Sequence, residues 1–118
     1  MAFHFYLGAI FPLCGKINRS LLRKQLRKIL PELEFSKNIY LWVFRPECLQ
    51  YLGTAAEKKV IYDYYDDYLL NSSGREVRRN EIREKKLLQQ SDYVFCTTEK
   101  LLAQAKKFNA SSFLLPNA

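Results

Sequence analysis

Three aspartates and four tyrosines crowd one short stretch of this sequence, residues 60–68, which reads VIYDYYDDY. Asp63, Asp66 and Asp67 follow an apolar run that has the character of a buried strand. Carboxylates at a strand end can orient sugar hydroxyl groups, or act as a base where the surroundings raise the pKa. The simpler interpretation is that these aspartates cap loop amides while the tyrosines pack.

A second polar pair, Thr98 and Glu99, stands where an apolar run gives way to a helical pattern. Thr98 is therefore a natural N-cap for the helix that follows. The unpaired amides of that first turn are also able to hold a substrate anion or hydroxyl group. Capping alone is the simpler of these two interpretations.

Basic residues without an intervening acid run from Lys16 to Lys28, on the helix face opposite the apolar positions. The chain has a net charge of +7, most of it in residues 1–60. Such a face contacts an anionic leaflet with about 1 kcal/mol per charge, although a solvated helix face is the simpler interpretation. No basic–aromatic interleaving supports nucleic-acid binding. The candidates for membrane or anion contact are Arg19, Arg23, Lys24, Arg27 and Lys28.

Several site types lack their motifs in this sequence. It holds no Gly-rich dinucleotide motif and no P-loop, so no cofactor is expected. His4 is the only histidine, which leaves no Ser/His/Asp or Cys/His set and no zinc-ligand spacing. The aspartates have the spacing Asp-x-x-Asp-Asp rather than Asp-x-Asp, so no metal is inferred.

The cysteines and the hydropathy indicate a cytoplasmic chain. Cys14, Cys48 and Cys96 are odd in number, lack CxxC spacing and lie in or beside apolar stretches, which is typical of reduced core thiols. No apolar run approaches the roughly 20 residues that span a bilayer.

Short apolar runs alternate with amphipathic runs along the whole chain. The expected strands cover residues 3–11, 38–44, 59–62, 92–97 and 112–115. The expected helices run from an N-cap at Asn18 to about Leu30, from Pro46 to about Glu57, over residues 75–90, and from Thr98 to about Phe108.

This order predicts one Rossmann-like domain over residues 1–118, a three-layer α/β/α arrangement with a mainly parallel five-stranded sheet. The strands lack clean polar–apolar alternation, which favours burial on both faces under two layers of helices. Ligands of such sheets bind beyond the carboxyl ends of the strands. The residues expected there are Asp63, Asp66, Asp67, Thr98 and Glu99.

From Phe11 onward the sequence resembles the amino-terminal domain of GT-B glycosyltransferases of the family-four type. The stretches that carry the resemblance, in the order of that family, are FPLCGKINRSLLRKQLRKIL, NIYLWVFRP, VIYDYYDDY with the charged helix after it, SDYVFCTTEKLL and FLLPNA. Two features depart from the pattern. Ala118 stands where the family has Gly, and the family's first strand with its Gly-rich loop has no counterpart.

The resemblance implies sugar transfer from a sugar nucleotide to a glycan or lipid-linked acceptor, in cell-envelope polysaccharide biosynthesis at the cytoplasmic side of the membrane. It implies that this chain is the truncated acceptor-side half, with Asp66, Asp67, Thr98 and Glu99 facing the cleft. The missing carboxyl-terminal domain would hold most donor contacts, so the chain is expected to be inactive alone, and no catalytic base is assigned.

Two other classes of protein are alternatives to the transferase. One is a non-catalytic α/β interaction module. The other is a receiver domain, which is disfavoured because its acids should follow the first and third strands, whereas here all three follow the third.

Overall fold

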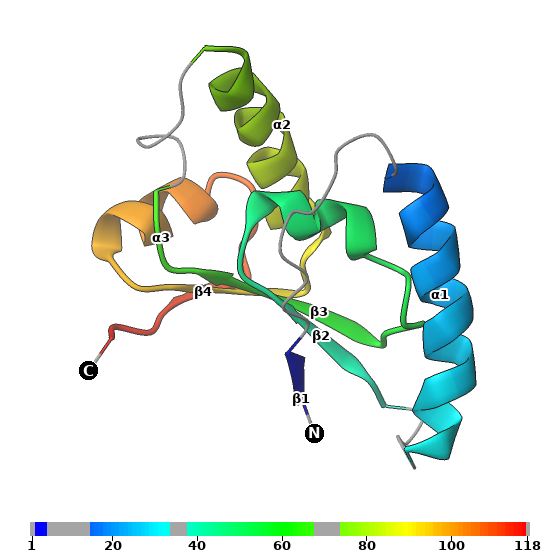
Figure 1. Ribbon diagram of the computed structural model, residues 1–118. Coiled ribbons are helices and arrows are strands. Elements are labelled where there is room, and N and C mark those ends of the chain that lie inside the picture. Colours follow the sequence, from blue (N-terminus) through cyan, green and yellow to red (C-terminus); the bar gives the residue numbers. More distant parts are fainter. Residues whose placement is uncertain (1, 5–14, 34–37, 68–73, 118) are drawn as a thin grey trace.

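The computed structural model describes residues 2–4, 15–33, 38–67 and 74–117. Within them strands and helices alternate along the chain, which is a mixed α/β fold (Figure 1). In chain order the elements are β1 (Ala2–His4), α1 (Gly15–Glu32), β2 (Tyr40–Val43), the 3-10 helix η2 (Pro46–Tyr51), β3 (Lys59–Tyr64), α2 (Arg75–Gln90), β4 (Tyr93–Cys96), α3 (Glu99–Ala105) and β5 (Ser112–Leu114).

The strands form a parallel sheet, which confirms that part of the prediction. Their order in the sheet follows their order in the chain, β1-β2-β3-β4-β5, and each neighbouring pair is parallel. Strands β2, β3 and β4 make up its main body, while β1 and β5 each pair three residues at the two edges. The expected first strand over 3–11 is thus seen only at its start, because residues 5–11 lie outside the described residues.

The described helices cover one face of this sheet. When strands follow one another in sheet order and the crossovers share one hand, their helices fall on the same side. Figure 1 shows η2, α2 and α3 on that side. The core there joins alternate strand residues, such as Tyr62 and Val94, to Leu87, Leu88 and Leu101 of the helices. Within the described residues the fold has two layers, so the predicted three-layer arrangement is not met.

The other face of the sheet carries no described helix. Burial alternates along β2, β3 and β4, with every second residue buried. The lack of polar alternation was interpreted as burial on both faces, but in the structure only one face meets helices. We call the other one the open face. It consists of Tyr40, Trp42, Lys59, Ile61, Asp63, Tyr93, Phe95 and Phe113.

Two of the helices differ from the predicted ones. Helix α1 begins at Gly15, so the predicted N-cap Asn18 lies inside the helix, and it continues past Leu30 through Pro31. A proline in the last turn removes only one amide donor, which the helix end tolerates. The helix expected to reach Glu57 is only the 3-10 helix η2, since the chain turns at Gly53 with a φ of 80°. The Glu57 carboxylate accepts hydrogen bonds from the amides of Gly53 and Ala55, which fixes the turn.

Asn109 joins the ends of α2, α3 and β5. Its side-chain amide donates to the carbonyl oxygens of Leu88 and Ser91, each at 2.8 Å. Its side-chain oxygen accepts from the Ser111 amide at 2.8 Å. These bonds satisfy carbonyl groups that the end of α2 leaves without helical partners.

Candidate functional site

The predicted polar residues gather where β3 and β4 end. These strands are parallel neighbours, so the segments 65–67 and 97–100 leave the sheet side by side. The Thr97 hydroxyl donates to the Tyr65 carbonyl oxygen at 3.1 Å. Lys100 Nζ lies 3.2 Å from Asp67 Oδ2. These contacts bind the two segments together, and we call the group Asp66, Asp67, Thr98, Glu99 and Lys100 the polar edge.

Each member of the polar edge has its own local role. Asp66 is exposed, and its Oδ1 accepts from the Asp67 amide at 2.8 Å. Thr98 caps α3 by accepting from the Leu101 amide at 3.2 Å, so the capping interpretation is confirmed. Glu99 is exposed in the first turn of α3, where its charge is favourable to the helix dipole. Asp66 and Glu99 therefore present carboxylates to solvent from adjacent segments.

Asp63 does not belong to the polar edge. Strand β3 runs to Tyr64, two residues beyond the predicted end, so Asp63 lies within the strand. Its Oδ2 accepts a hydrogen bond from Trp42 Nε1 at 3.3 Å, on the open face. The three aspartates of the 60–68 run are thus divided between two surfaces of the molecule.

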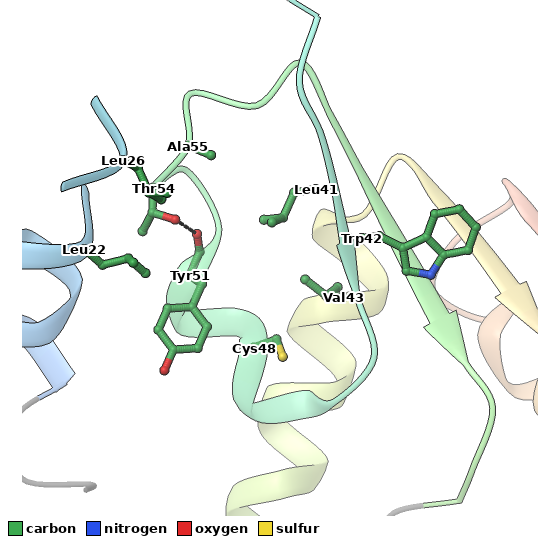
Figure 2. Close-up of a pocket in the computed structure, with 9 residues that line it drawn as sticks. All are labelled: Leu22, Leu26, Leu41, Trp42, Val43, Cys48, Tyr51, Thr54 and Ala55. Carbon is green, nitrogen blue, oxygen red and sulfur yellow. Dashed lines mark hydrogen bonds between the residues drawn. The ribbon is translucent and has the colours of Figure 1, made fainter. Parts of the chain in front are cut away.

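A hollow between α1, β2 and η2 is too small for a ligand (Figure 2). Its volume is about 10 Å³, which is room for at most about one water. Leu22, Leu26, Leu41 and Val43 point into it, whereas the Trp42 ring lies on the other side of β2. The hollow is a small packing gap between α1 and the sheet, not a binding site.

A buried acid lies between the sheet and the helices that cover it, outside the polar edge. Glu84 of α2 is 2% exposed, and its Oε1 accepts from the Tyr64 hydroxyl at 2.7 Å and from Gln104 Nε2 at 3.2 Å. Burial raises the pKa of Glu84, and the two hydrogen bonds oppose that shift only in part. Burial, with the Glu84 bond, also raises the pKa of Tyr64 far above its usual range.

The basic residues of α1 divide into two groups. Arg23, Lys24, Arg27 and Lys28 are exposed, and the first three line a shallow hollow with Ser20. Arg19 instead donates from its guanidinium to the Leu52 carbonyl oxygen at 2.8 Å. Arg19 is exposed as well, but it also ties α1 to the turn after η2. None of the helices within the described ranges is long and apolar enough to cross a membrane.

Two further observations bear on the identity of the site. In the part of the chain that the structure describes, no three His, Cys, Asp or Glu side chains are placed to hold a metal ion. Comparisons with family models, curated proteins and solved structures found no match to this chain. The glycosyltransferase resemblance therefore rests on the residues of the sequence alone.

Sequence reasoning did not single out three features of these surfaces. Lys100 was not selected, although it stands two residues after Thr98 on the first turn of a predicted helix. The Glu84–Tyr64 contact joins residues 20 apart, and no spacing rule points to it. The open face was hidden by its composition, because strands with apolar residues on both faces resemble fully buried ones.

Proposed function

We propose that this chain is the acceptor-side domain of a sugar-nucleotide-dependent glycosyltransferase, and that its polar edge faces a glycan or lipid-linked acceptor. The observation that carries the proposal is the convergence of Asp66, Asp67, Thr98 and Glu99 at the carboxyl ends of two adjacent parallel strands. Ligands of parallel α/β sheets bind at this end. The sequence resemblance assigns the same four residues to the acceptor cleft.

The chemistry of the polar edge suits hydroxyl groups. Ionised carboxylates only accept hydrogen bonds, and sugar hydroxyls are good donors to them. Lys100 holds Asp67, so Asp66 and Glu99 are the carboxylates available to an acceptor. The Tyr65 side chain, which is exposed beside them, offers a flat ring to a sugar.

The same geometry supports inactivity of the chain alone. A doubly wound sheet forms its ligand crevice where the strand order reverses, and the order β1 to β5 contains no reversal. Within the described residues no second group of strand ends faces the polar edge. A complete transferase needs a second domain to bring donor and acceptor to reacting distance. The Rossmann-like character of the fold is part of this proposal, and the alternation of helices with the strands of a parallel sheet supports it.

Saturation-transfer NMR with cellobiose, maltose, mannobiose and diacetylchitobiose tests the proposal. At least one disaccharide should receive saturation from the protein. The double variant Asp66→Asn/Glu99→Gln should reduce that signal several-fold, because amides are weaker acceptors than carboxylates. Glu32→Gln/Glu81→Gln is the matched control, since both residues are exposed on helices away from the polar edge. Equal signals from both double variants would remove the polar edge from acceptor binding.

A non-catalytic interaction module is the second candidate, and the open face favours it. A contiguous exposed apolar patch is typical of a protein–protein contact. An interaction module would use the open face and leave the polar edge unused. Disaccharide binding that depends on Asp66 and Glu99 separates the two candidates.

A further inference from the structure

The open face is an aromatic surface on a parallel sheet. Tyr40, Tyr93 and Phe113 on it are 38%, 41% and 49% exposed. Between them the ring centroids of Trp42 and Phe95 lie 5.9 Å apart, and those of Phe95 and Phe113 lie 6.1 Å apart. Parallel sheets are almost always covered on both faces. A face of this composition that no described element covers calls for an apolar, flat partner.

The strand register places a symmetric charge pattern at the centre of this face. Trp42, Ile61 and Tyr93 form one row across β2, β3 and β4. On β3, the middle strand of the order, Lys59 and Asp63 lie two residues to either side of Ile61 on the same face. One strand thus carries a positive and a negative charge at equal distances from an apolar centre.

We propose that a second copy of this chain covers the open face, in a two-fold dimer with the two sheets stacked face to face. The two-fold axis lies between the sheets, across the strands, and passes over Ile61. It sets β3 antiparallel to the β3 of the partner, with Ile61 over the same residue of the other copy. Lys59 of each copy then faces Asp63 of the other, which is the self-complementarity that an isologous interface requires.

The charges select this arrangement over its alternative. A two-fold axis along the strands would set Lys59 over Lys59 and Asp63 over Asp63, and like charges in contact are unfavourable. A nucleic-acid strand is disfavoured as occupant, because the face carries one acid for its one base. The ion pair of Lys59 with Asp92, at 2.9 Å, lies at the rim of the face, and Lys59 would share its charge between Asp92 and Asp63 of the second copy. This inference is independent of the proposed glycosyltransferase function, since it uses a different surface.

The face is small, which sets the expected affinity. Strands about 4.8 Å apart with a rise of about 3.3 Å per residue make it roughly 20 Å by 15 Å. Stable interfaces bury about 800 Å² of each partner. The face is well below that area, so the dimer is expected to be weak, and its test must reach high concentrations of the chain.

The dimer is tested by sedimentation equilibrium of the full chain. The concentrations run from about 1 to about 500 µM, which brackets a micromolar dissociation constant. The weight-average mass should rise from that of one chain toward twice that value. Lys59→Glu and Asp63→Lys should each weaken association at least tenfold, because each sets like charges opposite one another. An equimolar mixture of the two variants should recover dimer, since the introduced carboxylate of one variant then meets the introduced ammonium group of the other.

A second pair of variants protects the test against a charge variant that fails to fold. Phe113→Lys on the open face should abolish dimer, whereas Ile82→Lys, at a residue 52% exposed on α2, should leave it intact. A wild-type chain that stays monomeric up to the highest concentration overturns the proposal. So does a mixture of the charge variants that associates no better than either variant alone.

Discussion

At the scale of single residues, the buried carboxyl group of Glu84 is the most unusual feature of the core. Its side chain is enclosed between β3, α2 and α3, with hydrogen bonds from Tyr64 and Gln104 to one oxygen only. The other oxygen, Oε2, is buried without a hydrogen-bond partner. Because burial raises the pKa of Glu84, the protonated form is the better fit to the fold.

Glu84→Gln should therefore stabilise the protein at neutral pH. A raised folded-state pKa contributes stability that is fully present below the unfolded pKa and is lost as the pH rises through the folded pKa. Glutamine keeps an acceptor for Tyr64 and Gln104 and never ionises. Thermal unfolding from about pH 4 to about pH 8, on either side of the ordinary range for a glutamate, should show a melting-temperature gain that grows with pH. Glu32→Gln, exposed on α1 and not among the groups that shift the Glu84 pKa, should show no such gain, and parallel curves for Glu84→Gln and wild type would contradict the argument.

The cysteines supply a second prediction at this scale. Burial raises the pKa of the Cys96 thiol to about 11, so little thiolate forms at neutral pH. In a chain with Cys14→Ser and Cys48→Ser, a thiol reagent at mildly alkaline pH should react with Cys96 only as fast as the protein unfolds. Cys48 is half-buried and should react sooner in the chain that retains it.

The total thiol count tests the expected reducing compartment. Denatured wild-type protein, prepared without reductant, should titrate three thiols, one for each cysteine of the sequence. Cys48 and Cys96 are both free, whereas Cys14 lies outside the described residues. A count below three would indicate a disulfide and argue against a cytoplasmic location.

At the scale of elements, α1 carries the charge asymmetry of the chain on its outer side. Arg23, Lys24, Arg27 and Lys28 are exposed, while Leu26 and Leu30 pack against Ala55. We infer that this basic face attracts anionic surfaces. Arg19 is exposed too, but one of its guanidinium donors is used by the bond to Leu52.

Vesicle co-sedimentation measures that attraction. Binding to vesicles with anionic lipid should exceed binding to neutral vesicles and fade with salt, because exposed charges are screened over about 8 Å at physiological ionic strength. Arg23→Glu/Arg27→Glu should abolish the difference. Lys106→Glu/Lys107→Glu makes the same change of charge beyond α3 and should preserve it. Equal binding to both kinds of vesicle would rule out the basic face as a membrane contact.

The junction of α2, α3 and β5 depends on Asn109. Asn109→Ala leaves the carbonyl oxygens of Leu88 and Ser91 and the Ser111 amide without this partner. The free energy of unfolding should fall by about 2–3 kcal/mol, from about 1 kcal/mol per hydrogen bond. Urea titration measures it, with Asn117→Ala at an exposed position as control. A loss below about 0.5 kcal/mol, the size of an ordinary surface change, would show that these bonds do not hold the junction.

The elements were predictable to the extent that local patterns determine them. Residues 75–90 were predicted as a helix with the bounds that α2 has, because charged and apolar positions alternate there at helical spacing. The position of Thr98 as a cap was also predictable, because this threonine stands where an apolar run gives way to a helical pattern. The extent of β3 was not, since Asp63 and Tyr64 look like a strand end but pair with Phe95 and Cys96.

At the scale of the whole molecule, strand order decides what local patterns leave open. The apolar runs predict parallel strands with helices between them, but they do not say on which side each next strand is added. In the structure every strand is added on the same side, so the helices share one face, and no described element stands opposite the polar edge. That single property explains both the open aromatic face and the lack of a crevice beside Asp66 and Glu99.

The central claim is that the polar edge receives an acceptor and that this chain holds no donor site. The most direct test is a backbone-amide NMR titration with two ligands, the best-binding disaccharide and UDP-glucose. The disaccharide should shift the amides of residues 65–67 and 97–100, while UDP-glucose should shift none. Binding of UDP-glucose with a dissociation constant in the low micromolar range, about −8 kcal/mol, would contradict the claim, as would disaccharide shifts confined to other residues.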